Sequence, residues 1–179
     1  MQQRKIFITF ILLLFPGLAE ASFFDGLLSH KGVNPIRIPL YEESCGECHF
    51  AYQPGLLPER SWKKMMLPQS LENHFGDNAE LPEDDRMAIL KYVMEYAADH
   101  SLYKRSVKIF RSINEDVTPL KISEVPYIKR KHAKIPNRMI TGNKAVRLLS
   151  NCNACHTKAS TGSFDDDSVF IPNFGYWDD

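Results

Sequence analysis

Two short cysteine motifs constrain this chain more than any other feature of its sequence. Residues 45–49 and residues 152–156 both follow the pattern CxxCH. This pattern is the attachment site of a c-type haem: two thiols one helical turn apart can each add to a vinyl group, and the next histidine then meets the iron as its proximal ligand. The sequence thus predicts two covalently bound haems c. The expected thioether cysteines and proximal histidines are Cys45, Cys48, Cys152, Cys155, His49 and His156.

Other uses of paired cysteines explain the sequence less well. A structural zinc site needs two such pairs about 12–20 residues apart, whereas 103 residues separate Cys48 from Cys152. A thioredoxin-like redox motif would lie in a βαβ pattern, which the sequence lacks. Disulfides are compatible with an exported protein. None of these alternatives explains why a histidine follows both pairs.

The N-terminal residues 1–21 have the pattern of a secretory signal peptide. Arg4 and Lys5 precede an apolar run over residues 6–15, and Ala19-Glu20-Ala21 offers a small-x-small cleavage site. A membrane-spanning helix needs about 20 apolar residues, so this run is too short to be an anchor. We expect cleavage after Ala21 and an exported, soluble mature chain in the periplasm.

Charge is balanced overall but divided unevenly along the chain. With 22 basic and 22 acidic residues in all, bulk nucleic-acid binding has no electrostatic support. Residues 22–100 carry 7 basic and 13 acidic side chains, while residues 101–179 carry 13 basic and 8 acidic ones. This asymmetry fits either a solvated surface or a polar molecule oriented towards a charged partner.

The length of 179 residues suggests one domain, or two small ones sharing a core. The positions of proline and glycine and the spacing of apolar residues in the mature chain predict a mainly α fold with extensive loops. A short helix is expected over residues 61–67, with Ser61 as its N-cap. Other short helices are expected within residues 101–115 and 143–150, and residues 117–140 are expected to be mostly extended or turned.

The strongest predicted helix begins at Pro82 and fades near His100. Three acidic residues lie in its first turn, where they suit the helix dipole. Its apolar face is expected to combine these residues: Met87, Ile89, Leu90, Val93, Met94, Tyr96 and Ala97.

Each predicted iron has a sixth coordination position. The candidates are the remaining histidines and the methionines of the mature chain: His30, His74, His100, His132, Met65, Met66, Met87, Met94 and Met139. His74 lies 25 residues after His49, where a loop can fold over the haem. His132 stands among lysines, a setting more typical of a surface histidine. Met65 and Met66 fit a core better than a ligand role.

Residues 42–171 contain several characteristic stretches around and between the two motifs: Glu43-Ser44 with the first CxxCH, Tyr52-Gln53-Pro54-Gly55-Leu56-Leu57-Pro58, His74-Phe75-Gly76-Asp77-Asn78-Ala79, Ile122-Ser123, Tyr127, Lys131-His132, Ile135-Pro136, and Asn151 with the second CxxCH, followed by Ala159 and Gly162. With these stretches the chain resembles the dihaem cytochrome c family of bacterial periplasmic proteins.

The resemblance implies two bis-histidine haems, with His74 and His132 as distal ligands. Proximity in the sequence pairs His74 with the first haem and His132 with the second. It also implies that residues 22–100 form a part similar to a class I cytochrome c, and that residues 101–179 form an irregular part wrapped around the second haem. Members of the family commonly work beside a membrane b-type cytochrome or a small oxygen-binding haem protein.

The C-terminal part holds two further groups of interest. Its aromatic residues are expected to form a lid on the second porphyrin, with an exposed docking patch as the alternative: Phe164, Phe170, Phe174, Tyr176 and Trp177. Its basic cluster either neutralises haem propionates or meets an acidic partner: Lys129, Arg130, Lys131 and Lys134.

These features favour a low-potential electron carrier rather than an enzyme. Two haems in 158 mature residues must lie close together, and histidine at both axial positions disfavours substrate binding at iron. Histidine in place of methionine also lowers the reduction potential. Three alternatives stay open: a dihaem subunit of a periplasmic reductase, a carrier with one labile axial histidine that binds small gases, and a dihaem peroxidase, although such enzymes are much longer.

Overall fold

The structure is a computed structural model that describes residues 31–177. The expected signal peptide and the candidate ligand His30 lie outside the described residues. The α-helices are α2 (Pro39–Gly46), α3 (Glu59–Met65), α4 (Pro68–Glu72), α5 (Glu83–Glu95), α6 (Lys104–Arg111) and α7 (Pro126–His132). The 3-10 turns are η1 (Pro54–Leu56), η2 (Ile122–Glu124), η3 (Asn137–Met139), η4 (Cys152–Ala154), η5 (Ala159–Thr161) and η6 (Asp166–Ser168). The strands are β1 (Phe170–Ile171) and β2 (Gly175–Tyr176).

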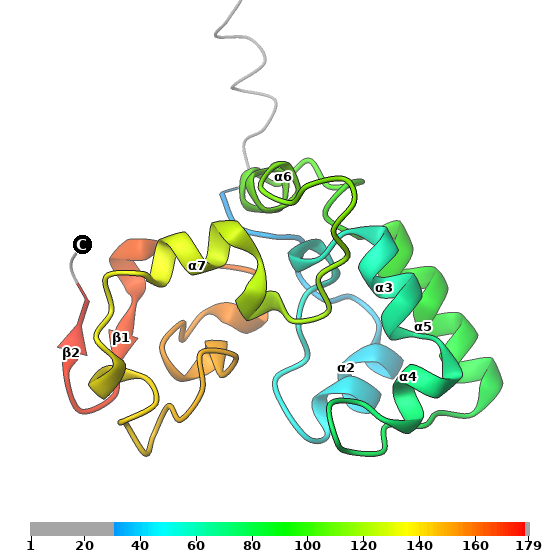
Figure 1. Cartoon of the computed structure of the whole chain (residues 1–179), viewed down its shortest axis with the longest axis horizontal. Helices are drawn as coiled ribbons and strands as arrows, with labels where there is room; N and C mark the ends of the chain where they lie inside the picture. The colour runs from blue at the N-terminus through cyan, green and yellow to red at the C-terminus, as the bar shows by residue number, and fades with distance from the viewer. Residues whose placement is uncertain (1–30, 178–179) are drawn as a thin grey trace, which may run out of the picture.

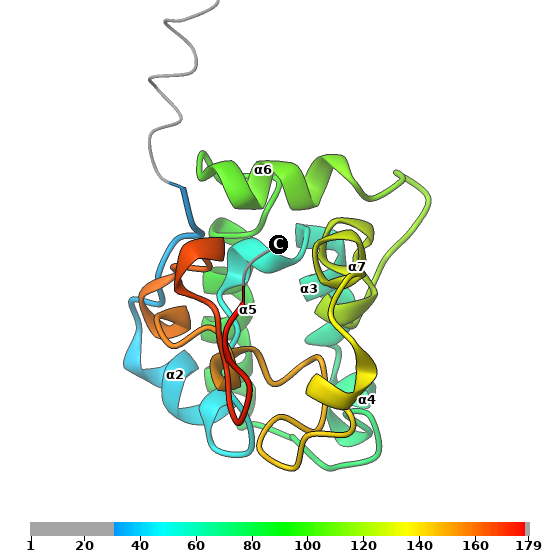
Figure 2. The same cartoon turned by 90° about the vertical axis from the view of Figure 1, so that its left-hand side faces the viewer.

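The prediction of a mainly helical fold with extensive loops is confirmed. Helices α3, α4 and α5 gather at one end of the long axis, and the β1–β2 hairpin lies at the other (Figure 1). Helix α6 lies along the top of the molecule, apart from both groups (Figure 2). Within residues 31–177, no helix is both long and apolar enough to cross a membrane.

Helix α5 begins where the sequence predicted, but its buried face differs from the expected one. Pro82 is the N-cap, and the first turn is acidic. Ile89, Tyr92 and Val93 are buried, whereas Met87 is 48% exposed. The prediction assigned too many residues to the buried face of α5. The helix has two apolar sides, and only one of them packs against α3 and α2.

Helix α3 begins at Glu59, so the expectation of an N-cap at Ser61 is wrong. Ser61 is completely buried within the helix. Pro58 precedes the helix, and the backbone N–H of Glu59 donates to the Asp99 side chain at 2.9 Å. A carboxylate from a distant loop therefore satisfies the helix end that a local serine was expected to cap.

One further prediction of local structure holds only in part, and another is wrong. Residues 117–140 contain helix α7, because Pro126 sits at its first position, where proline is tolerated. Residues 143–150 form turns instead of a helix: Arg147 has a φ of 68°, and the Asn143 side chain accepts from the backbone of Ala145 at 3.1 Å. Such side-chain bonds compete with helix formation.

The C-terminal chain is joined closely to the N-terminal chain. Val33 N–H donates to the Gly162 carbonyl at 2.9 Å. A Cβ on Gly162 would meet the Val33 oxygen at 2.2 Å, and its φ is 76°, so only glycine fits here. A contiguous buried cluster extends from Val33 through the helices to Phe164.

Candidate haem-binding sites

The first CxxCH motif begins at the end of α2. Cys45 lies in the last turn of this helix, and the chain leaves the helix before Cys48 and His49. Burial raises the pKa of the Cys45 thiol to about 11, while Cys48 and His49 are exposed. The motif thus has one enclosed thiol and an open side.

His74 faces His49 from the loop between α4 and α5. The two ring centroids are 6.2 Å apart and the rings are tilted by only 21°. A tight turn presents His74: its N–H donates to the Asp77 carbonyl at 2.7 Å, and Phe75 has a φ of 58°. This matches the expectation that a loop folds over the site.

The second CxxCH motif is a 3-10 turn rather than an α-helical one. Cys152 begins η4, and the Cys155 N–H donates to the Cys152 carbonyl at 3.2 Å, three residues back. Burial raises the pKa of the Cys152 thiol to about 11 and raises that of Cys155 as well. The Phe170 N–H donates to the Cys155 carbonyl at 3.0 Å, so the β1–β2 hairpin is hydrogen-bonded directly to this motif.

His132 faces His156 from the last residue of α7. Their ring centroids are 6.0 Å apart, with the rings nearly perpendicular at 77°. His132 Nδ1 donates to the Ile128 carbonyl one turn back, at 2.8 Å. The lysines beside His132 therefore do not place it on the surface, because the helix turns its ring towards His156.

Both ring separations fit an iron between two imidazoles. A metal–nitrogen bond of about 2 Å on each side, with about 1 Å from each nitrogen to its ring centre, places the centroids about 6 Å apart. His49 Nδ1 donates to the Phe50 carbonyl at 2.8 Å, as His132 Nδ1 does to Ile128, which leaves Nε2 of each ring available to a metal. His74 and His156 have buried Nδ1 atoms without a partner among the described residues.

The protonation states also suit metal binding. Burial, then the neighbouring His49, lowers the pKa of His74. Burial, then His132 and Arg105, lowers the pKa of His156 to about 4. Both rings are therefore neutral at physiological pH, and a neutral ring has the lone pair that an iron needs.

A cavity of about 1070 Å³, including space open to solvent, surrounds His132 and His156. Most of its lining residues are apolar, as is typical of a pocket that covers an apolar ligand. Its walls come from α7, η2, η4 and the hairpin, and also from Leu56 of η1. Met139, one of the candidate ligands, lines the same cavity.

The expected aromatic lid is divided between two roles. Phe164 is buried with its ring centroid 5.3 Å from that of His156, and Trp177 lines the cavity. Phe170, Phe174 and Tyr176 are exposed, Tyr176 to 79%. Alternation along the hairpin puts neighbouring residues on opposite faces, so only part of the aromatic set can cover a porphyrin.

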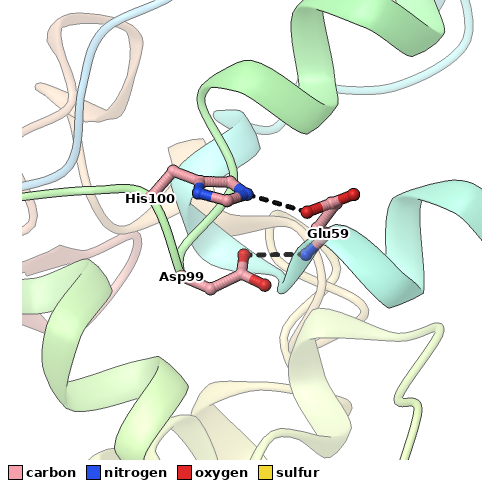
Figure 3. Close-up of side chains that lie close together, drawn as sticks. All are labelled: Glu59, Asp99 and His100. Atoms are coloured by element: carbon pink, nitrogen blue, oxygen red, sulfur yellow. Dashed lines mark hydrogen bonds and ion pairs between the residues drawn. The ribbon is translucent and has the colours of Figure 1, made fainter.

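The remaining candidate ligands lie elsewhere. His100 Nε2 is 2.8 Å from a Glu59 carboxylate oxygen, beside the Asp99 carboxylate that caps α3 (Figure 3). Met65 and Met66 are buried in the core, as expected. In the basic cluster, Lys131 pairs with Asp166 at 2.6 Å and lines the cavity.

Sequence reasoning missed some residues at these sites. Arg105 lines the second cavity and donates to the Phe164 carbonyl at 2.7 Å. Tyr52 lies against His49, with ring centroids 5.0 Å apart. Tyr52 belongs to a stretch that resembles the family, but the sequence assigned it no role. No local sequence pattern pointed to Arg105.

The family model for dihaem cytochrome c matches residues 41–164. The chain belongs to the dihaem cytochrome c family. Accordingly it carries two covalently bound c-type haems, and the two CxxCH motifs and the paired imidazoles fit them. No curated protein matches the sequence.

Solved structures of the family share the fold. A dihaem cytochrome c from Shewanella baltica is 38% identical, with a TM-score of 0.64 over 78% of this chain and 97% of that one. One from Rhodobacter sphaeroides is 42% identical, with a TM-score of 0.65 over 74% of this chain and all of the other. A second Rhodobacter sphaeroides structure is 41% identical, with a TM-score of 0.59. These cytochromes are similar to the present chain over nearly their whole length.

Proposed function

We propose that this dihaem cytochrome is a periplasmic electron carrier with closed, bis-histidine irons. The observation that carries the proposal is the pair of facing imidazoles at each site, His49 with His74 and His132 with His156. In both pairs the ring centroids are separated by the distance that an iron bound between two imidazoles requires. Each haem, when bound, supplies an iron that accepts and releases one electron.

The side chains have separate tasks in this proposal. Cys45 and Cys48 hold the first haem through thioethers, and Cys152 and Cys155 hold the second. The four histidines occupy all axial positions, which leaves no position for a substrate and favours low potentials. We propose that residues 22–100 hold the first haem and residues 101–179 the second, with contributions across that boundary from residues such as Leu56.

The proposed partners are redox proteins: a membrane b-type cytochrome as donor, or a small oxygen-binding haem protein as acceptor. The exposed basic residues Lys129 and Arg130 are on α7, the helix that lines the second cavity, and suit an acidic partner. A stable complex on pull-down from the native host would instead favour the alternative of a reductase subunit.

The optical spectrum of the purified protein, oxidised and reduced, with and without carbon monoxide, tests the proposal. Closed irons are expected to stay low-spin in both states and to ignore carbon monoxide. A haem that becomes high-spin on reduction and binds carbon monoxide would overturn the closed-iron proposal and favour the gas-binding alternative. Turnover of peroxide with a reduced donor would favour an enzyme.

A further inference from the structure

One short segment is shared by the two haem sites. The Tyr52 ring packs against His49, the expected proximal ligand of the first site. Its hydroxyl donates to the Ser150 carbonyl at 2.7 Å, across 98 positions of sequence. Ser150 lies two residues before Cys152 and lines the second cavity. A single side chain therefore touches the ligand of one site and the attachment segment of the other.

The residues that follow Tyr52 continue this contact. The completely buried Gln53 side chain donates to the Ala159 carbonyl, just beyond the second motif. Leu56 lines the second cavity. The segment from Tyr52 to Leu56 thus forms a common wall between the sites.

Tyr52 is itself held firmly. Its carbonyl accepts a hydrogen bond from the Tyr41 hydroxyl. The Phe50 and Tyr52 rings pack edge to face, with their centroids 5.7 Å apart. The backbone and the ring of Tyr52 are therefore both anchored, which keeps its hydroxyl directed at Ser150.

We propose that Tyr52 is the bridge between the two haem sites: it fixes their separation and provides the protein contact through which they exchange electrons. The proposal rests on the electron-transfer function proposed above. In one exchange, an electron leaves the reduced haem at one site, which is oxidised, and enters the oxidised haem at the other, which is reduced. Tyr52 keeps its proton and its electrons throughout.

The contacts on either side of Tyr52 are of the kind that couples redox centres. On one side its ring meets the His49 ring directly. On the other side the Tyr52 hydroxyl donates to the Ser150 carbonyl, and Cys152 follows two residues later in the chain. Electronic coupling falls less steeply through bonds and tight contacts than through a gap, so loss of either contact should slow exchange.

Two substitutions separate the contacts. Tyr52→Phe keeps the ring beside His49 and removes only the bond to Ser150, while Tyr52→Leu removes both. Tyr92→Phe is the matched control, because Tyr92 is a buried tyrosine whose hydroxyl accepts a backbone bond from Arg37 at 3.0 Å, and it does not line the second cavity. Haem content and the low-spin spectrum verify that each variant is loaded and folded.

The measurements are the interhaem exchange rate, from NMR of half-reduced protein, and the separation of the two midpoint potentials. We expect exchange to slow several-fold in Tyr52→Phe and further in Tyr52→Leu, with a changed separation of potentials, and no change in Tyr92→Phe. Unchanged rates and potentials in both Tyr52 variants would overturn the bridge, as would equal slowing in the control. Carbon monoxide binding by the unaltered protein contradicts the proposed function separately and leaves this comparison intact.

Discussion

The two haem sites use the same motif in different surroundings. The first lies against helices: Cys45 is in the last turn of α2, and His74 lies between α4 and α5. It is also the more open site, with His49 exposed and Phe75 exposed to 53%. The second is built from short turns, one seven-residue helix and a hairpin, around a cavity that lowers the pKa of His156 to about 4. The first site is therefore supported by helices that pack against one another. At the second site, most of the supporting segments line the cavity itself.

The largest expected effect of this difference concerns haem removal. In a Cys152→Ala/Cys155→Ala variant we expect loss of the second haem and of protease resistance in the C-terminal chain, because its apolar side chains face the emptied cavity. In Cys45→Ala/Cys48→Ala the helices α3 and α5 keep their packing through Ile89 and Val93. Haem quantification and mapped limited proteolysis distinguish the variants. Equal protease sensitivity of both would remove the contrast.

The proposed distal ligands, His74 and His132, should also respond unequally. His74→Ala is expected to open the first iron fully, giving a high-spin haem that binds carbon monoxide. In His132→Ala, Met139 in the same cavity can replace the histidine, leaving part of the second haem low-spin with a raised potential. Spectra with carbon monoxide test both variants, and His132→Ala/Met139→Leu is the control. If that double variant binds no more carbon monoxide than His132→Ala, Met139 has no such role.

The two potentials should differ in a defined order. An enclosed site with basic neighbours disfavours the oxidised iron, so the second haem should have the higher potential. Lys131→Gln leaves Asp166 unpaired and is expected to lower this potential by on the order of tens of millivolts, with the first haem unchanged. Potentiometry with site-specific NMR assignment measures both. A larger shift at the first haem would contradict the predicted order.

The smallest expected effect concerns the scaffold of the first site. Bonds from Lys63 and His100 lower the pKa of Glu59. A depressed pKa stabilises the fold above the unfolded value of about 4.3, and the stabilisation is lost as pH falls through the folded pKa. Glu59→Gln should therefore lower the free energy of unfolding by at most about 1 kcal/mol near pH 7 and by nothing at low pH. Urea titrations at both pH values test this, since a loss independent of pH would point to packing instead.

Local patterns predicted the parts of the molecule that depend on local chemistry. The CxxCH motifs fix haem attachment, and Pro82 with its acidic turn fixes the start of α5. The pattern failed where distant residues decide the structure. Asp99 caps α3 from forty positions away, and Arg147 leaves the helical region at a site where a helix was expected. His132 appeared exposed among lysines until the geometry of α7 directed its ring inward.

The angles between the imidazole rings have a magnetic consequence under the proposed ligation. Parallel axial rings lift the near-degeneracy of the iron d orbitals along one common direction, whereas perpendicular rings largely cancel that effect. The first site, at 21°, should then give a rhombic ferric electron paramagnetic resonance signal, and the second, at 77°, a strongly axial one with a large maximal g value. The protein thus labels its two irons by ring orientation alone, so that each can be followed separately during a redox titration of the unaltered chain.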